Sequence, residues 1–303
     1  MKVFLTGATG FVGQAILEEL RRAGHSVRIL VRDPKSQRVQ ESVSRFGLEV
    51  YPGNVLDSDS LFGTLQGMNA VIHLVGIISE IGRNTFENVH VYGTENMIAA
   101  ATEAKVERFV HMSAMGTRPG AVSRYHQSKW AAEEALRHSQ LDYTIHRPSL
   151  IFGPQDKFVN FFATLMRFSP VIPIMADRRA RFQPVAIETI AAAFVSSVSE
   201  PKSIGQTFDL CGPDKLTLAE IVDVISMVTR RKRLKVQVPL GLACWQAAIL
   251  EYVFPRILKK ASPLNRDQLI MLQEDNIGNA QPANSLFRLQ PIAFRERIAR
   301  YLR

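Results

Sequence analysis

Short apolar runs alternate with helical patterns through the first half of the chain. Each run is rich in β-branched or aromatic residues. The runs are Val3–Leu5, Val27–Val31, Leu48–Tyr51, Ala70–Leu74, Phe109–Met112 and Tyr143–His146. Strands separated by amphipathic helices favour right-handed βαβ crossovers, which build a parallel sheet covered by helices on both faces. The pattern therefore predicts an α/β protein with a doubly wound parallel sheet.

The second half of the chain predicts a discontinuous division into two domains. Segments 182–186 and 207–210 are expected to return to the sheet, with a helix over 187–198 between them. The first domain would then contain residues 1–151 plus about 182–211. A smaller, mostly helical lobe would contain 152–181 plus 212–303 and bind a substrate or partner. In this lobe Thr217 and Glu220 have the capping-box spacing that opens a helix over 218–228, and 292–302 predicts a closing helix.

A glycine pattern follows the first predicted strand and opens a helix. Gly7 permits a tight turn, Gly10 lets the backbone approach a pyrophosphate, and Gly13 allows the helix to pack closely on the strand. The helix N-terminus then presents free N–H groups to the anion. We therefore predict a Rossmann-type NAD(P)-binding domain in preference to a purely structural turn. The candidate cofactor contacts in this turn are Gly7, Thr9, Gly10, Phe11, Val12 and Gly13.

The end of the second predicted strand distinguishes the two nicotinamide dinucleotides. An acidic residue there accepts the ribose hydroxyls of NAD, whereas an arginine pairs with the 2′-phosphate of NADP. Arg32 comes first after Val31, and Asp33 follows it. We therefore predict NADP, with NAD as the alternative if Asp33 takes the ribose.

Tyr125 and Lys129 stand four residues apart at the start of a helical pattern that runs to about His138. This spacing places the phenol and the ammonium on one helix face. A nearby cation lowers the pKa of a tyrosine, so we expect Tyr125 to exchange a proton with a substrate hydroxyl or carbonyl. Lys129 is also a candidate to hold the nicotinamide ribose. On its own the pair is more often a surface feature, and it gains specificity from the glycine turn upstream.

With these motifs in place, the chain resembles the short-chain dehydrogenase/reductase superfamily, in particular its extended branch of nucleoside-diphosphate-sugar epimerases and dehydratases. The resemblance covers nearly the whole chain. It rests on TGATGFVG, GNVLD at 53–57, HLVG at 73–76, GTEN at 93–96, YHQSK and RPSLIFGP at 147–154. It implies that Asn54 or Val55 lies near the adenine. It also implies further cofactor contacts at Leu74, Val75, Gly76, Pro148, Ser149, Leu150 and Ile151.

Two positions depart from the pattern of active members. Ala114 replaces one of two serines after the fifth strand, and His90 replaces an asparagine. Ser113 is therefore the remaining candidate to polarise a substrate oxygen. The segment between Ser113 and Tyr125 is also short for a sugar-nucleotide epimerase. With these departures the chain resembles an atypical subgroup that includes the NADPH-binding accessory subunit of respiratory complex I. This resemblance implies that NADPH is bound in a structural role.

Three functions therefore stay open. The first is an NADP-dependent oxidoreductase or epimerase/dehydratase-type enzyme that uses Tyr125, Lys129 and Ser113 on an unidentified small molecule. The second is a non-catalytic NADPH-binding accessory or assembly protein of a respiratory or quinone-related complex. The third is a redox-sensing regulator that distinguishes oxidised from reduced cofactor without turnover.

Composition and charge limit the classes of partner and the cellular compartment that we expect for this protein. The chain has 303 residues, of which 46% are hydrophobic and 21% charged, as in ordinary globular proteins. Lysine and arginine exceed the acids by 37 to 28, giving a net charge of +9, yet the basic runs lack interleaved aromatic residues, so no nucleic acid is expected. Cys211 and Cys244 alone fit a reducing compartment, and the opening strand leaves no room for a signal peptide, so we expect a cytoplasmic protein.

The seven histidines have no metal-ligand spacing, so no metal site is expected. His73, His111 and His146 lie in or at the ends of predicted strands, where hydrogen-bonded core histidines are the simplest interpretation. His90 falls on a helix that would face the cofactor.

The run Leu240–Phe254 is broadly apolar and lies between basic segments. We expect a core helix of the second lobe. The alternative is a helix that lies on an anionic membrane or docks a membrane partner, which would place the protein at the inner face of the membrane. That alternative, through residues 240–260, would suit a hydrophobic substrate such as a quinone or polyprenyl derivative.

Overall fold

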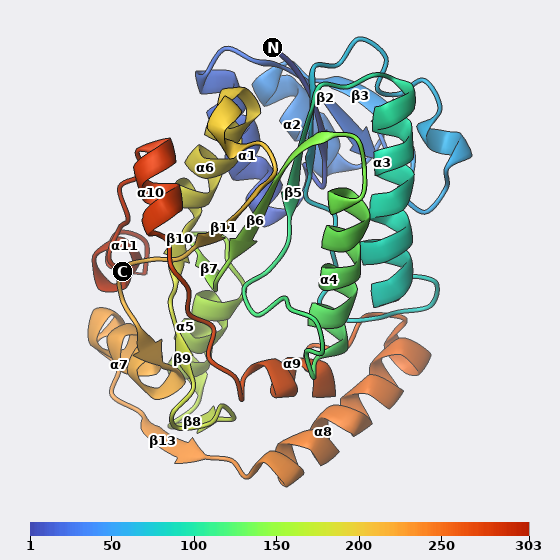
Figure 1. Cartoon of the computed structure of the whole chain (residues 1–303). Helices are drawn as coiled ribbons and strands as arrows, with labels where there is room; N and C mark the ends of the chain where they lie inside the picture. The colour runs from blue at the N-terminus through green and yellow to red at the C-terminus, as the bar shows by residue number, and fades with distance from the viewer. Residues whose placement is uncertain (303) are drawn as a thin grey trace.

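A seven-stranded sheet organises the computed structural model, which describes residues 1–302 (Figure 1). All of its neighbouring strands run parallel. In sheet order the strands are β11 (Gln206–Leu210), β6 (Asp142–Pro148), β5 (Arg108–Met112), β4 (Ala70–His73), β1 (Lys2–Thr6), β2 (Ser26–Val31) and β3 (Glu49–Pro52). This order confirms the predicted doubly wound sheet.

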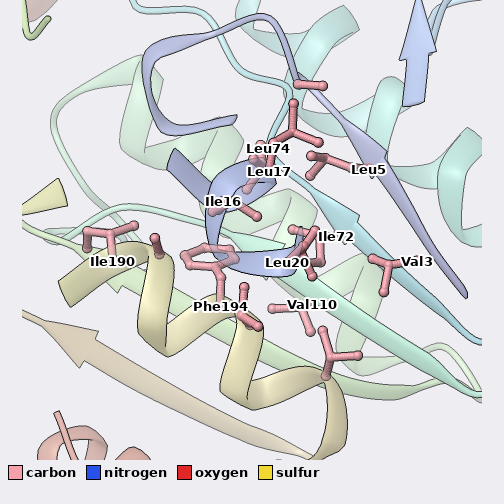
Figure 2. Close-up of a cluster of buried hydrophobic side chains, with 14 of the residues drawn as sticks. Val3, Leu5, Ile16, Leu17, Leu20, Ile72, Leu74, Val110, Ile190 and Phe194 are labelled. Atoms are coloured by element: carbon pink, nitrogen blue, oxygen red, sulfur yellow. The ribbon is translucent and has the colours of Figure 1, made fainter. Parts of the chain in front are cut away.

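Helices cover both faces of the sheet because its strands alternate their apolar side chains between two cores. Val3 and Leu5 belong to one core and Phe4 to the other. The first core receives α1 (Phe11–Arg22), α2 (Gln37–Phe46), α6 (Ile187–Ser199) and α10 (Gln281–Phe287). The second receives α3 (Gly93–Glu103) and α4 (Arg124–Arg137). Figure 2 shows α1 and α6 meeting over the sheet through Ile16, Leu20 and Phe194.

Of the two later segments that were predicted to join the sheet, only one does so. Residues 206–210 form its edge strand beside β6, but 182–186 lie outside it. Instead β9 (Arg181–Phe182) pairs antiparallel with β12 (Leu216–Thr217), and β10 (Val185–Ala186) pairs parallel with β7 (Ile151–Phe152). Pro184 separates β9 from β10, and because proline has no N–H donor it prevents one continuous ladder strand.

The remaining elements form the second lobe beyond the carboxyl ends of the strands, with a main core and a separate small cluster where two of its helices meet. They are α5 (Phe158–Phe168), β8 (Val171–Ile174), α7 (Leu218–Thr229), β13 (Leu234–Gln237), α8 (Leu240–Val253), α9 (Arg266–Met271) and α11 (Phe294–Ile298). Phe152, Phe162 and Phe294 are buried in the main core. The capping box of Thr217 and Glu220 is present at the start of α7. The closing helix is shorter than predicted and ends at Ile298.

The prediction of a core helix at 240–254 is wrong. Helix α8 buries only Ala243 and Ala247, which pack on Leu269 of α9. Trp245 is 66% exposed and Tyr252 is 62% exposed. The small residues of α8 therefore face inward and its large apolar residues face outward. Within residues 1–302, no helix has the length and apolar character needed to cross a membrane.

Candidate active site

The glycine turn has the geometry that a pyrophosphate cradle requires. Gly7 has a φ of +73°, a conformation that side-chain-bearing residues rarely adopt, and its carbonyl accepts the Gly10 N–H at 3.0 Å. A Cβ on Gly13 would lie 2.3 Å from the Gly7 carbonyl oxygen. Gly10 begins α1 without a side-chain cap, so the first N–H groups of the helix stay available to an anion. The predicted turn residues therefore fit a dinucleotide.

Gln14 holds this turn in place, and the sequence pattern alone offered no reason to single it out. Its amide Nε2 donates to the carbonyl of Ala8 and to the hydroxyl of Ser42, both at 2.9 Å. Ser42 lies on α2, so the glycine turn is braced against the helix that follows β2.

Arg32 is exposed directly after β2, where an NADP 2′-phosphate would lie. The neighbouring Asp33 carboxylate already accepts the Lys35 N–H at 3.0 Å, closing a local turn.

Asn54, which follows β3, also closes a turn, since its side chain accepts the Leu56 N–H at 3.1 Å. Asn54 borders a cavity of about 570 Å³. Its other lining residues are Leu56, Asp57, Arg83, Asn84, Asn88 and Tyr92.

Val55 is buried against Gly93 at the start of α3, and its carbonyl accepts a hydrogen bond from Asn96 at 2.8 Å. Asn96 belongs to the GTEN segment, so this segment fixes the loop after β3. The predicted residues Leu74, Val75 and Gly76 follow β4. A Cβ on Gly7 would lie 3.2 Å from Cβ of Leu74, so the glycine turn and the loop after β4 meet closely.

Lys129 and Gly76 meet on the other side of that loop. A Cβ on Gly76 would lie 3.2 Å from Nζ of Lys129 and 3.4 Å from Nε2 of His90. Lys129 is only 2% exposed and donates to the carbonyl of Met112 at 3.0 Å. Burial lowers the pKa of Lys129 to about 8, while Glu133 opposes this shift. The structure thus brings the predicted Lys129 to the predicted loop of the cofactor path.

Tyr125 is half-buried among aromatic rings, and within residues 1–302 its phenol makes no hydrogen bond. Its ring lies edge-on to His90 at 5.3 Å and to Phe86 at 5.9 Å between centroids. Burial, and secondarily the Asp267 carboxylate, raise the pKa of Tyr125 to about 12. The expected lowering by Lys129 is therefore wrong for this structure, because desolvation and a nearby anion both favour the protonated phenol.

His90 is a hydrogen-bonding hub beside both residues. Its Nε2 accepts the Ile77 N–H at 3.0 Å, and its Nδ1 lies 2.8 Å from the Ser128 hydroxyl. Because Nε2 accepts, Nδ1 carries the proton and donates to Ser128, which donates in turn to the Tyr125 carbonyl. Burial and the Lys129 ammonium lower the pKa of His90 to about 2, so the ring stays neutral.

Ser113 is committed to a buried charge cluster. Its hydroxyl donates to the Glu133 carboxylate at 2.5 Å, and this carboxylate also pairs with Arg137 and Arg147. Glu133 is fully buried. Among the described residues, the Ser113 hydroxyl bonds to Glu133 and Thr117, and no hydrogen bond joins it to Tyr125.

The predicted segment 148–151 leads from β6 into β7. The Pro148 carbonyl accepts the Met115 N–H at 2.9 Å, and the Ser149 hydroxyl donates to the Asn276 carbonyl at 2.9 Å. Leu150 packs on the core of the second lobe and Ile151 on the core of the sheet. The segment therefore joins the two cores beside the site, and its link to Asn276 was not predictable from local sequence.

Asp267 is the clearest residue that sequence reasoning missed. It lies on α9, and its carboxylate accepts the N–H groups of Arg124 at 2.8 Å and Tyr125 at 3.0 Å, together with the Ser123 hydroxyl at 2.8 Å. It thus satisfies free donors at the start of α4 and carries a negative charge to the positive end of that helix. The second lobe in this way fixes the turn that bears Tyr125.

The core histidines are only partly hydrogen-bonded. His73 bonds to Thr6 at 2.8 Å and His146 to Ser197 at 2.7 Å. His111 is buried with no partner for either ring nitrogen within the described chain, so the prediction of a hydrogen-bonded histidine is wrong there. It stacks on His73, with ring centroids 5.6 Å apart. Across residues 1–302, no group of three histidine, cysteine or acidic side chains is placed to hold a metal ion.

The glycine turn, the buried Lys129 and the parallel sheet are together typical of a dinucleotide-binding protein of the Rossmann type. A family model described as NAD(P)H-binding matches residues 7–158, about half of the chain. The chain therefore belongs to the NAD(P)H-binding family, and its parallel-sheet domain is of the Rossmann type.

Two curated relatives and one solved structure refine this picture. The chain is 28% identical over 279 residues to NADH dehydrogenase (ubiquinone) 1 alpha subcomplex subunit 9 of Arabidopsis thaliana, covering 89% of this chain and 69% of the relative. It is 31% identical over 200 residues to the ceramide reductase of Caulobacter vibrioides, covering 66% of this chain and 61% of the relative. The chain thus spans about two thirds of these relatives' lengths.

The solved structure is a nucleoside-diphosphate-sugar epimerase from Staphylococcus aureus. It has a TM-score of 0.78, covers 99% of both chains and is 17% identical in sequence. This likeness shows the shared fold. The predicted resemblance is thereby confirmed as membership of the NAD(P)H-binding family, with sequence similarity to the complex I subunit and a fold shared with the epimerase.

Proposed function

We propose that this protein is an NADP(H)-dependent oxidoreductase that uses Tyr125 and Lys129. The observation that supports this most directly is the approach of the Lys129 ammonium to Gly76, on the loop that packs against the glycine turn. A lysine that is only 2% exposed costs folding free energy, and its retention beside the cofactor path suits a ribose-holding role. The ceramide reductase relative supports a reductive activity for this chain.

The protonation states of the site favour reduction. A nicotinamide dinucleotide supplies hydride transfer when bound. Because its pKa is raised to about 12, Tyr125 keeps its proton at neutral pH and donates it to a carbonyl oxygen of the substrate. Lys129 orients the ribose, while His90 and Ser128 hold the helical turn that carries the phenol. The proposed role of Ser113 in polarising the substrate oxygen requires that its proton turn away from Glu133.

NADP is the proposed dinucleotide. The exposed Arg32 guanidinium is available to a 2′-phosphate, and the Asp33 carboxylate is already bonded to its own turn. Replacing Arg32 with alanine should weaken NADPH binding about tenfold or more and leave NADH binding nearly unchanged. Equal losses for both dinucleotides in a fluorescence titration would favour NAD instead.

The test of catalysis is a Tyr125→Phe variant of the full chain. Dinucleotide affinity should stay within about twofold, while turnover of an aldehyde or ketone panel falls about 10²- to 10⁴-fold. A Tyr252→Phe variant is the matched control, because Tyr252 is 62% exposed on α8 and lies outside the candidate site. Turnover that survives at Tyr125→Phe would remove the catalytic assignment.

A second candidate is a non-catalytic accessory protein, which the complex I subunit relatives favour. A bound dinucleotide would then stabilise the fold by mass action. The distinguishing observation is an NADPH-dependent rise in melting temperature without turnover on any substrate, together with co-purification of respiratory-complex subunits. For either function we propose that the parallel-sheet domain holds the dinucleotide and that the lobe of residues 152–181 plus 212–303 holds the substrate or partner.

A further inference from the structure

Helix α8 presents large apolar side chains to solvent along one stripe. Leu242, Trp245, Ile249 and Tyr252 follow one another at intervals of three, four and three residues, which places them on one helix face. They are 57%, 66%, 41% and 62% exposed respectively. The opposite face carries the buried Ala243 and Ala247. The hydrophobic face of this helix therefore points away from the protein.

The stripe continues beyond the end of α8. The π-helical segment Phe254–Leu258 exposes Ile257 by 71% and Leu258 by 51%. Exposed apolar side chains in such a contiguous group are characteristic of a surface that meets another apolar phase. We call this group, Leu242 to Leu258, the α8 face.

Positive charge borders the α8 face at its carboxyl end. Arg256, Lys259 and Lys260 are exposed, and Arg256 stacks on the Tyr252 ring at 4.0 Å from its centroid. Glu251 is the one acid between 240 and 260, and it is neutralised by an ion pair with Arg266 at 2.8 Å. A protein partner with an apolar groove would not require this charge, whereas an anionic lipid surface attracts it.

We propose that the α8 face docks on an anionic membrane surface, with Trp245 and Ile249 seated in the headgroup and acyl boundary and Lys259 and Lys260 against lipid phosphates. Helix α9 lies between α8 and the start of α4, where Asp267 bonds to Tyr125 (Figure 1). Docking would therefore turn the side of the molecule that carries Tyr125 toward the bilayer. The proposal goes beyond the proposed function, since it holds whether or not Tyr125 is catalytic.

The test is co-sedimentation of the full chain with vesicles of phosphatidylcholine alone or mixed with phosphatidylglycerol. Wild-type protein should bind the anionic vesicles at least about tenfold more tightly than the neutral ones. Trp245→Ser with Ile249→Ser should lose at least about tenfold in binding. The matched control is Phe62→Ser, because Phe62 is 74% exposed on the sheet domain. This control should bind as wild type.

A charge-reversal pair tests the basic border separately. Lys259→Glu with Lys260→Glu should weaken binding to anionic vesicles about tenfold or more, whereas Lys2→Glu with Lys105→Glu should leave it unchanged. NADPH binding by each variant reports that the sheet domain is folded. Trp245 emission should shift to shorter wavelength on vesicle addition.

Three results would overturn the proposal. The first is absence of wild-type binding to anionic vesicles. The second is an equal loss in the patch variants and their controls. The third is a dimer that Trp245→Ser with Ile249→Ser dissociates in sedimentation velocity, which would assign the α8 face to a second copy of the chain. Because NADPH binding and turnover are measured without vesicles, failure here leaves the proposed function to its own tests.

Discussion

Replacement of Lys129 by methionine should make the dinucleotide-free protein more stable at neutral pH. The fall in pKa from 10.5 to about 8 on burial corresponds to about 3 kcal/mol, at 1.36 kcal/mol per pKa unit. At pH 7 the folded protein bears this cost of holding a buried ammonium. Methionine has similar length without the charge, but it leaves the Met112 carbonyl without its donor, which costs about 1 kcal/mol. The expected net gain is about 2 kcal/mol.

The sign of the pH dependence follows from proton binding. Between pH 8 and 10.5 the unfolded lysine stays protonated while the folded one loses its proton, so the unfolded state binds more protons. The stability of the wild-type protein should therefore rise with pH across this window through Lys129. The variant lacks this contribution, so its advantage should shrink to near zero by about pH 10.

The assay is urea denaturation followed by far-ultraviolet circular dichroism at pH 7, 8, 9 and 10, without dinucleotide. Lys2→Met is the control, because Lys2 is exposed at the start of β1. It should give a stability difference that does not change with pH. A Lys129→Met variant that is less stable at pH 7, or a difference constant over the series, would refute the reasoning. The same variant should bind NADPH at least about tenfold more weakly.

Three further outcomes are expected. Gly13→Ala should lower the free energy of unfolding by about 1–3 kcal/mol and abolish NADPH binding, because its Cβ would lie 2.3 Å from a backbone oxygen. Gly241→Ala is the control, since its Cβ would meet nothing within 4 Å and should not destabilise the protein. Asp267→Asn should lower the melting temperature through about 1 kcal/mol of lost capping, and should lower the pKa of Tyr125 in an ultraviolet titration. Glu133→Gln should destabilise by about 3–5 kcal/mol in urea denaturation, because it leaves two arginines without their buried partner.

Local patterns determined the sheet domain. Alternating apolar residues in strands such as β1 define two cores, and Gly7 and Gly13 occupy positions where a side chain is excluded by the backbone itself. These properties depend on residues a few positions apart, so the sequence predicts them well. The spacing of Tyr125 and Lys129 likewise placed both on α4.

Long-range contacts decided what the site can do. The pKa of Tyr125 is raised by burial and by Asp267, which lies 142 residues away along the chain and caps its helix. Ser113 donates its proton to Glu133, whose carboxylate also pairs with Arg147 on β6. These two contacts join different elements, so no local spacing reveals them. Helix α8 was expected to be buried because its composition is apolar. Composition does not specify which face has a neighbour, and only the packing of Ala243 and Ala247 on α9 turned its large side chains outward.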